Sequence, residues 1–254
     1  MESIIKSRIF ATNHFAENWG ANTLLADNLK QVQEQIASAL DKRKNKDLLT
    51  GDKVTLVAVT KNHPLEIITD IEALGIANVG ENRVQEIQAK RPLGAYTGRP
   101  LHFIGHLQTN KVKYLVGVVD LIESVDRLEL LECIEKQAEK VGVVQNILFE
   151  VNIGAEESKS GFTPAEAAAL AARMADFPHT ALKGLMAIPP VSEFPGENCR
   201  YFAEMRNLFV DIRAKKYDNV SMECLSMGMS DDLEEAIAAG SDQVRIGTAL
   251  FGSR

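Results

Sequence analysis

Val54 to Lys61, VTLVAVTK, is the stretch on which the fold assignment depends. Its residues up to the lysine are apolar, small or β-branched and lack helical spacing, which is typical of a strand buried on both faces of a parallel sheet. The lysine comes where the strand ends. Partial burial lowers the pKa of a lysine toward the neutral amine that attacks carbonyl groups. A strand-end lysine that points into water is the simpler interpretation, and this stretch alone leaves both open.

The composition favours a soluble α/β protein. With 254 residues and 45% hydrophobic residues, the chain suits one large domain or two small ones with a sizeable core. Its formal charge of −7 argues against general binding of nucleic acid or of acidic membranes, which requires a dense basic face. The three cysteines are isolated, so no disulfide framework or zinc knuckle is indicated.

A cytoplasmic location is expected. No run approaches the roughly 18 apolar residues of a membrane span, and the N-terminus lacks the apolar core of a signal peptide. A transit peptide is not favoured, because Glu2 and Glu17 accompany the early basic residues.

Strands alternate with helices from the quoted stretch to the end of the chain. Apolar runs predict strands at 54–60, 76–82, 101–106, 121–125, 146–152, 182–188, 221–228 and 242–252. Helices are expected between them, with Asp126 as the N-cap of a helix over 127–141 whose buried stripe is Leu128, Leu131, Ile134 and Ala138. Thr163 and Pro164 are expected to start an alanine-rich helix.

Eight such alternations predict a closed (β/α)8 barrel of the TIM type. A doubly wound open sheet is the rival, but its glycine-rich turn after the first strand is replaced here by Lys61-Asn62-His63-Pro64. Leucine, valine and isoleucine at helical spacing predict an additional N-terminal helix at 20–45. We therefore expect one domain over 1–254, with a leading segment at 1–19, that helix, and a barrel at 50–254.

In such barrels the chemistry lies at the carboxyl ends of the strands, and phosphate often binds after strands seven and eight. Lys61 ends the first predicted strand. Ser226 and Gly228 end the seventh, and Gly247 and Thr248 end the eighth. Hydroxyl donors with glycines that admit backbone N–H groups are typical of a phosphate cradle, although each loop alone could be an ordinary turn.

A reactive lysine opposite a phosphate cradle indicates a phosphorylated aldehyde held as a Schiff base, and pyridoxal 5′-phosphate (PLP) is the commonest such ligand. A Schiff-base aldolase is the competing hypothesis. Those enzymes usually carry the lysine on a middle strand beside acidic partners, whereas Lys61 is on the first strand with none adjacent in sequence.

Six segments together resemble the pyridoxal phosphate homeostasis proteins, a family similar to the N-terminal domain of alanine racemase. They are VAVTK (57–61), GENRVQE (80–86), HFIGHLQTNK (102–111), GLMAI (184–188), LSMGMSDD (225–232) and VRIGTALFG (244–252). The resemblance extends from about residue 20 to the C-terminus. It departs slightly from the common family form at Arg83, which leaves the implied site intact.

The resemblance implies that Lys61 forms the Schiff base, that Ser226, Gly247 and Thr248 hold the phosphate, and that Arg245 faces the pyridine nitrogen. Cofactor contacts are therefore expected from Lys61, Asn82, Met186, Ser226, Met227, Arg245, Gly247 and Thr248. Because a guanidinium only donates hydrogen bonds, Arg245 would leave the ring nitrogen unprotonated and the cofactor a weak electron sink.

A carrier function is therefore expected in place of strong catalysis: reversible holding of PLP, buffering of its aldehyde and delivery to PLP-dependent apo-enzymes. A PLP-dependent racemase is the alternative. Racemases need a second base, a tyrosine from a further domain, and we expect no such domain because the chain ends close after the eighth strand. We expect a monomer for the same reason.

Other polar residues are expected to be peripheral. His102 and His106 do not share a helix face, so no metal site is expected, and His106 is expected near the cofactor mouth. The loop at 156–161 is a candidate rim of the site. Lys111 and Lys113 are expected on the outer helix, although attraction of phosphate-bearing ligands is the alternative.

Overall fold

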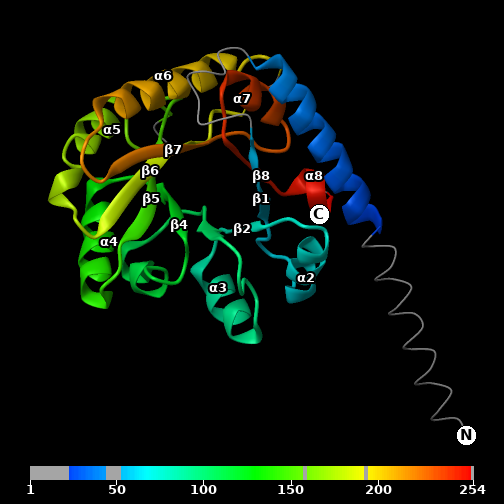
Figure 1. Cartoon of the computed structure of the whole chain (residues 1–254), viewed down its shortest axis with the longest axis horizontal. Helices are drawn as coiled ribbons and strands as arrows, with labels where there is room; N and C mark the ends of the chain where they lie inside the picture. The colour runs from blue at the N-terminus through cyan, green and yellow to red at the C-terminus, as the bar shows by residue number, and fades with distance from the viewer. Residues whose placement is uncertain (1–22, 44–52, 157–158, 192–193, 253–254) are drawn as a thin grey trace, which may run out of the picture.

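Eight parallel strands form a closed barrel in the computed structural model (Figure 1). The structure describes residues 23–43, 53–156, 159–191 and 194–252. The strands are β1 (Thr55–Val59), β2 (Asn78–Glu81), β3 (Leu101–Phe103), β4 (Leu121–Val125), β5 (Gln145–Val151), β6 (Thr180–Ala187), β7 (Val220–Ser226) and β8 (Gln243–Ile246). The predicted barrel is confirmed.

Helical segments follow the strands and surround the barrel. They are α2 (Leu65–Ala73), α3 (Val84–Lys90), η2 (Arg91–Leu93), η3 (Thr109–Tyr114), α4 (Leu128–Val141), α5 (Pro164–Ala171), η4 (Met174–Asp176), α6 (Cys199–Lys215), α7 (Leu233–Ala239) and α8 (Thr248–Phe251). The segments labelled η are 3-10 helices, so the short helix expected after β3 is wound more tightly than an α-helix.

The barrel closes where β1 pairs with β8, with Val57 opposite Arg245 and Ala58 opposite Ile246. Every other strand pairs with its neighbours in sequence, and all pairs are parallel. All strands therefore present their carboxyl ends at one mouth, which is where barrel chemistry is found.

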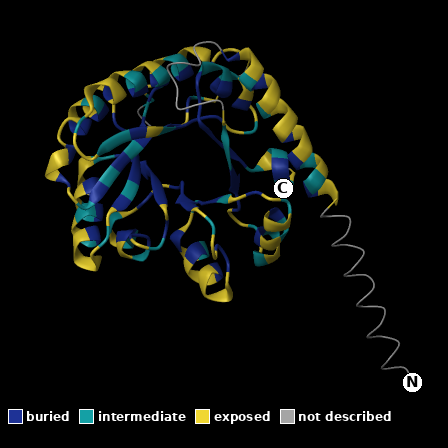
Figure 2. Cartoon of the chain, viewed as in Figure 1, coloured by how far each residue is buried: buried dark blue, intermediate teal, exposed yellow. Residues whose placement is uncertain are grey.

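The main apolar core lies between the strands and the surrounding helices. Figure 2 shows buried residues along the strands and on the barrel-facing sides of the helices, with exposed residues outside. The largest fully buried side chains include Phe103, Phe149, Phe202 and Phe209. Burial on both faces explains why the strands read as nearly unbroken apolar runs.

A leading helix over residues 23–42 packs beside α7 and α8 (Figure 1). Leu25, Leu29 and Val32 bury the predicted apolar stripe. Asn28 donates a hydrogen bond to the carbonyl oxygen of Leu250 at 2.8 Å. At the end of this helix, the buried Arg43 donates to the carbonyl oxygens of residues 237 and 241. The expected leading segment 1–19 and connection at 44–52 lie outside the described residues.

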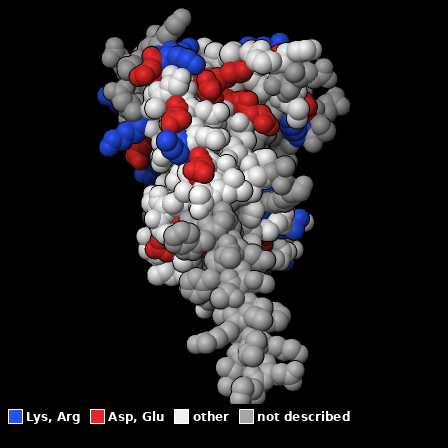
Figure 3. All heavy atoms as spheres, turned by 90° about the vertical axis from the view of Figure 1, so that its right-hand side faces the viewer, with Lys and Arg blue, Asp and Glu red and all other residues white. Residues whose placement is uncertain are grey.

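The face that carries the leading helix has acidic and basic side chains interspersed (Figure 3). An example is the ion pair between Lys42 and Glu234, which links that helix to α7 at 3.1 Å. Within the described ranges, no helix combines the length and apolar character needed to cross a bilayer.

The expected N-cap and part of the expected stripe of α4 were wrong. Arg127, and not Asp126, occupies the N-cap position, and no side chain caps the helix. The Asp126 carboxylate is engaged elsewhere, 2.6 Å from the Arg127 guanidinium and 3.2 Å from the His106 ring. Leu128 is 38% exposed, and Leu130 is buried instead.

The cap of α5 is confirmed. The Thr163 hydroxyl accepts a hydrogen bond from the Glu166 N–H, and the Glu166 carboxylate accepts one from the Thr163 N–H, as in a capping box. Pro164 takes the first helical position, where its missing N–H costs nothing.

The last predicted strand was too long. β8 ends at Ile246, and the chain from Thr248 to Phe251 forms α8 instead. The Ala249 N–H at the start of this helix donates to the Ser230 hydroxyl at 3.1 Å, which ties α8 to the loop after β7.

Candidate functional site

The carboxyl ends of β1 and β8 bring Lys61 beside the Gly247-Thr248 turn. Strands β1 and β8 are paired neighbours in the barrel. Lys61 comes two residues after the end of β1, and Thr248 comes two residues after the end of β8. Lys61 is exposed at the mouth of the barrel, whereas the preceding Thr60 is completely buried. The predicted lysine therefore stands where the buried strand reaches the open end of the barrel.

The turn that carries Lys61 is held from both sides. The Thr60 N–H donates to the Gly80 carbonyl oxygen at 3.0 Å, which continues the pairing of β1 with β2. The His63 N–H donates back to the Thr60 carbonyl oxygen at 3.1 Å, and Asn62 adopts a positive φ of 59°. Asparagine is among the few non-glycine residues that tolerate this conformation.

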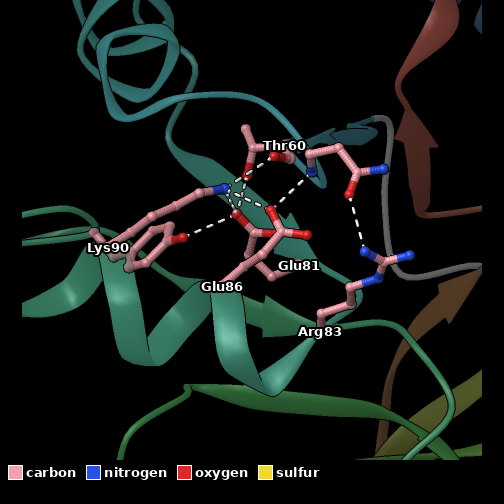
Figure 4. Close-up of polar contacts among 7 residues, drawn as sticks. Thr60, Glu81, Arg83, Glu86 and Lys90 are labelled. Atoms are coloured by element: carbon pink, nitrogen blue, oxygen red, sulfur yellow. Dashed lines mark hydrogen bonds and ion pairs between the residues drawn. The ribbon is translucent and has the colours of Figure 1, made fainter.

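Side chains from β2 and α3 contact this turn (Figure 4). The Lys90 ammonium lies 2.8 Å from one carboxylate oxygen of Glu81 and 2.8 Å from one of Glu86. The same Glu81 oxygen accepts hydrogen bonds from the hydroxyls of Thr60 and Tyr96, each at 2.8 Å. Burial, followed by the charge of Glu81, raises the pKa of Tyr96, so this phenol remains protonated.

A cavity of about 280 Å³ opens at the same mouth. Its lining comes from the ends of β2, β3, β5 and β6 and from the loop after β5: Asn82, Ile104, Gly105, His106, Glu150, Val151, Asn152, Lys159, Ser160 and Ile188. The side-chain oxygen of Asn82 is buried and has no hydrogen-bond partner within the described chain. A buried unpaired acceptor at a cavity wall is costly unless a ligand or water satisfies it.

Gly105 allows two loops to meet beside this cavity. A Cβ atom on Gly105 would lie 2.1 Å from the carbonyl oxygen of Asn82, too close for any side chain. The Gly105 carbonyl oxygen also accepts a hydrogen bond from the Ser124 hydroxyl at 2.6 Å. The cavity wall at Asn82 therefore depends on the absence of a side chain at residue 105.

Below the mouth, the barrel interior contains a polar network. The Glu123 carboxylate on β4 contacts His102 on β3, Ser226 on β7 and Gln243 on β8 at 2.6, 2.6 and 2.7 Å. Because these strands lie on different sides of the barrel, the contacts cross its interior. Burial works to raise the pKa of Glu123, but the hydrogen bond and charge of His102 and the charge of Arg245 outweigh it and hold the pKa below its ordinary value.

Arg245 lies at the upper edge of this network. Its guanidinium donates to the Ser226 hydroxyl at 2.6 Å and to the Ala187 carbonyl oxygen at 2.9 Å. Only 4% of the residue is exposed. The charge of Arg245 is thus linked through Ser226 to the Glu123 carboxylate, which offsets the cost of burying it.

Glu150 is a second interior carboxylate, and it lines the mouth cavity. Burial and the nearby charge of Asp126 raise the pKa of Glu150 to about 7, although Arg245 acts in the opposite direction. Glu150 pairs in register with Met186 on β6, and Met186 pairs with Ser226 on β7.

Gly247 has space that the protein itself does not fill. A Cβ atom built there would make only ordinary contacts, the nearest being 3.5 Å from Val59, and its φ of −117° suits any residue. Packing among the described residues therefore does not require glycine at this position. An anion that approached the first N–H groups of α8 closely would require it, because a side chain there would occupy the same space.

The predicted site residues fall into two layers. Lys61, Asn82, Gly247 and Thr248 belong to the ends and loops of their strands, at the mouth. Met186, Ser226, Met227 and Arg245 are buried. The Ser226 hydroxyl contacts Arg245, Glu123 and Gln243, so the structure places it among internal partners, and its expected phosphate contact stays a prediction.

The interior partners Glu123 and Gln243 and the acidic cluster beside Lys61 were not predicted from the sequence. A charged residue inside the apolar run LIESV was a usable signal, because a carboxylate in a buried strand requires partners. Glu86 and Lys90 were also visible as an i,i+4 pair.

The residues expected at the periphery of the site lie on the loops and outer helices around the mouth. His106 lies at the mouth, as expected, and lines its cavity. Lys111 and Lys113 lie on η3 with their ammonium groups 5.8 and 5.0 Å from the Tyr114 ring. Lys159 and Ser160 line the cavity, as expected of a rim loop. Within the described part of the chain, no three His, Cys, Asp or Glu side chains are grouped to hold a metal.

Comparison with known proteins supports the same architecture. The family model described as the alanine racemase N-terminal domain matches residues 25–254. A protein of Aquifex aeolicus named pyridoxal phosphate homeostasis protein is 41% identical over 228 residues, which cover 90% of this chain and 97% of that one.

Solved structures agree with the sequence comparison. PipY of Synechococcus elongatus, solved with PLP bound, is similar with a TM-score of 0.74 and 30% identity, over 90% of this chain and 100% of that one. An alanine racemase of Clostridium difficile shares the fold with a TM-score of 0.69 and 17% identity, over 90% of this chain and 57% of the racemase.

Proposed function

The chain belongs to the alanine racemase N-terminal domain family and, within it, to the pyridoxal phosphate homeostasis proteins, and from this premise we propose that it binds PLP at the barrel mouth and acts in the homeostasis of that cofactor. Lys61 is its attachment point. The observation that carries the proposal is the pairing of β1 with β8, which places an exposed lysine beside the Gly247-Thr248 turn.

The residues at the mouth fit this cofactor. A pyridine ring with a phosphate needs one anion site and hydrogen-bonding groups around the ring. The first turn of α8 offers backbone N–H groups beside a Gly247 position that the described chain does not fill. Asn82 lines the mouth cavity, and its buried side-chain oxygen is an acceptor with no partner among the described residues.

PLP supplies an aldehyde, which condenses with a neutral primary amine to a C=N bond and releases one water molecule. Lys61 provides that amine. Because an ammonium has no electron pair to donate, Lys61 must lose a proton before it attacks. Its exposed position lets that proton pass to solvent.

Arg245 is proposed to face the pyridine nitrogen. Two of its N–H groups are held by Ser226 and Ala187, which fixes the guanidinium plane, and a guanidinium has three further N–H donors. Because a guanidinium does not give up a proton, Arg245 would leave the ring nitrogen of bound PLP unprotonated, and the cofactor would then stabilise carbanions only weakly. Holding the cofactor suits this environment better than carbanion chemistry.

A racemase is the alternative function, and the geometry gives it less support. Racemisation needs a second base on the opposite face of the substrate carbon. Tyr96 is turned away toward Glu81, and Tyr114, Tyr201 and Tyr217 lie on or beside outer helices. As far as the described residues define the mouth cavity, no tyrosine lines it.

The proposal extends to how the protein works in the cell. It includes a monomer in the cytoplasm that exchanges PLP with apo-enzymes. The exposed mouth supports exchange, and the three cysteines are unpaired, as in a reducing compartment. The single domain over 1–254 and the set of eight cofactor contacts are part of the same proposal.

Absorbance titration with PLP tests the proposal. Wild-type protein is expected to develop a visible band that borohydride abolishes, and Lys61→Ala is expected to show no such band. Racemisation of alanine or serine above about one turnover per second would overturn the carrier function. Absence of the band from both proteins would also overturn the proposal that the chain holds PLP as a Schiff base.

A further inference from the structure

We infer that Glu86 and Lys90 are positioning residues for Lys61: together with Glu81 they fix the backbone on both sides of it and so set the place from which its amine reacts. This inference rests on the proposed attachment of PLP to Lys61. Neither residue contacts the mouth cavity, so their role is exerted through the turn.

The residue before Lys61 is fixed by Lys90 and Glu81. The Lys90 ammonium donates to the Thr60 carbonyl oxygen at 3.2 Å. The Thr60 hydroxyl donates to the Glu81 carboxylate at 2.8 Å. Thr60 is thus held at both its carbonyl and its side chain, by partners on α3 and at the end of β2.

The residue after Lys61 is fixed by Glu86 and Arg83. The Asn62 N–H donates to the Glu86 carboxylate at 2.7 Å, and the Arg83 guanidinium donates to the Asn62 side-chain oxygen at 3.3 Å. These contacts come from the first turn of α3 and its N-cap. They hold Asn62 in its positive-φ conformation, which reverses the chain directly after Lys61.

The contacts of Glu81, Glu86 and Lys90 with Thr60 and Asn62 are called the clamp below. One buried ion cluster joins its two halves. The same Glu86 oxygen that accepts the Asn62 N–H lies 2.8 Å from the Lys90 ammonium, which reaches Glu81 at 2.8 Å (Figure 4). The side chains of Lys90, Glu81 and Glu86 are 11%, 0% and 16% exposed. At this burial the contacts are poorly screened by salt, so they hold the turn more firmly than a surface pair would.

The turn is also connected to the proposed phosphate site. The His63 ring packs against the Phe251 ring of α8, with centroids 4.5 Å apart. A clamp on residues 60–63 therefore fixes the spacing between Lys61 and the first turn of α8. Covalent attachment requires the amine and the bound aldehyde to be in reacting distance, and small misplacements cost large factors in rate.

The experiment compares Glu86→Ala and Glu86→Gln with a matched control, Glu135→Ala. Glu135 also accepts a backbone N–H, that of His179 at 2.9 Å, and its side chain is 14% exposed. Glu135 lies on α4, and its backbone partner His179 directly precedes β6, at the amino end of that strand. Gln at residue 86 keeps an acceptor oxygen for the Asn62 N–H but loses the charge.

Two readouts are measured on the full chain. The rate of amide hydrogen exchange at Asn62 and His63, measured without cofactor, reports whether the hydrogen bonds that hold the turn are formed. The rate at which added PLP becomes trapped on Lys61 by borohydride reports its effect on the amine, and circular dichroism verifies folding of each variant.

In Glu86→Ala we expect exchange at Asn62 to rise and the trapping rate to fall by about tenfold, since a hydrogen bond to a charged group is lost. Glu86→Gln should recover part of both effects, and Glu135→Ala should change neither. If Glu86→Ala behaves like the control in both readouts, the inference is overturned. If wild-type protein traps no PLP, the proposed function is overturned, and the exchange readout still decides whether the clamp exists.

Discussion

At the scale of single residues, Ser226 connects the buried cation of the site to the buried anion beneath it. Its hydroxyl donates to Glu123 and accepts from Arg245, each at 2.6 Å, and accepts from Gln243 at 3.0 Å. A hydroxyl both donates and accepts, which no apolar side chain of that size can do. Ser226 therefore helps to fix the orientation of the Arg245 guanidinium.

Replacing Ser226 with alanine tests this role. Ser226→Ala leaves Arg245 and Glu123 each short of one buried partner, so we expect the free energy of unfolding to fall by about 2–3 kcal/mol. We also expect weaker PLP binding. Urea denaturation measures the first effect and absorbance titration the second.

Ser221→Ala is the matched control for that substitution. Ser221 lies on the same strand, is partly exposed, and accepts a hydrogen bond from Lys183 at 3.0 Å. Its loss should change stability by less than about 1 kcal/mol. Equal effects of the two substitutions would contradict the proposed orienting role of Ser226.

Glu150 predicts a pH dependence of stability. Its pKa is about 7 in the folded protein against an ordinary value of 4.5, mainly because it is buried. Between these values the folded protein holds a proton that the unfolded chain releases, so this group lowers the free energy of unfolding as the pH rises. Glu150→Gln removes the effect, and its stability relative to wild type should increase from pH 5 to pH 8.

The expected increase is roughly 1–3 kcal/mol, reduced from the full shift because the side chain retains some exposure. Urea denaturation of both cofactor-free proteins at several pH values measures it. A stability difference that does not vary with pH would show that the Glu150 proton is not retained on folding.

At the scale of elements, the loops at the mouth use glycine for two different reasons. Gly105 permits close contact with Asn82, whereas Gly247 leaves space beside the first turn of α8. Gly105→Ala should lower the free energy of unfolding by about 1–3 kcal/mol, because a new Cβ atom forces the two loops apart. Gly247→Ala should leave stability nearly unchanged and weaken PLP binding.

Thermal unfolding and PLP titration of both variants separate the two roles. Loss of stability in Gly247→Ala with unchanged affinity would mean that packing, and not a ligand, requires glycine there. Normal stability of Gly105→Ala would mean that the contact between residues 82 and 105 does not shape the cavity.

The helices and strands could be predicted from the sequence only in part. Apolar runs located all eight strands, because strands buried on both faces leave a continuous signal. Residues 248–251 were wrongly extended from β8, since short apolar runs do not distinguish a strand from a helical turn. Asp126 was wrong as a cap because Arg127 and His106, one of them distant in sequence, engage its carboxylate.

At the scale of the whole molecule, closure of the barrel assembles the candidate site. Lys61 and Arg245 are far apart in sequence, yet β1 and β8 are paired neighbours. The sequence pattern predicted that adjacency once eight strands were recognised. It could not predict the interior network, because hydrogen bonds among His102, Glu123 and Ser226 depend on strand register and on which side chains face inward.

Closure of the barrel also places two lysines at the same mouth. The central claim is that PLP attaches to one of them, Lys61, and not to the other. Lys61 follows β1, and Lys159 lines the cavity, where its ammonium donates to the Pro189 carbonyl oxygen at 3.1 Å. The proposed function requires PLP to be held by Lys61, because that residue adjoins the first turn of α8.

The most direct measurement is the mass of the peptide that carries the cofactor after borohydride reduction of the PLP-loaded protein. Cleavage after Lys53 and Arg83 would release residues 54–83 as one fragment, since a modified Lys61 resists trypsin. We predict that this fragment carries the reduced pyridoxal phosphate, and that Lys61→Ala carries none. Modification of Lys159 alone, or of neither lysine, would contradict the account.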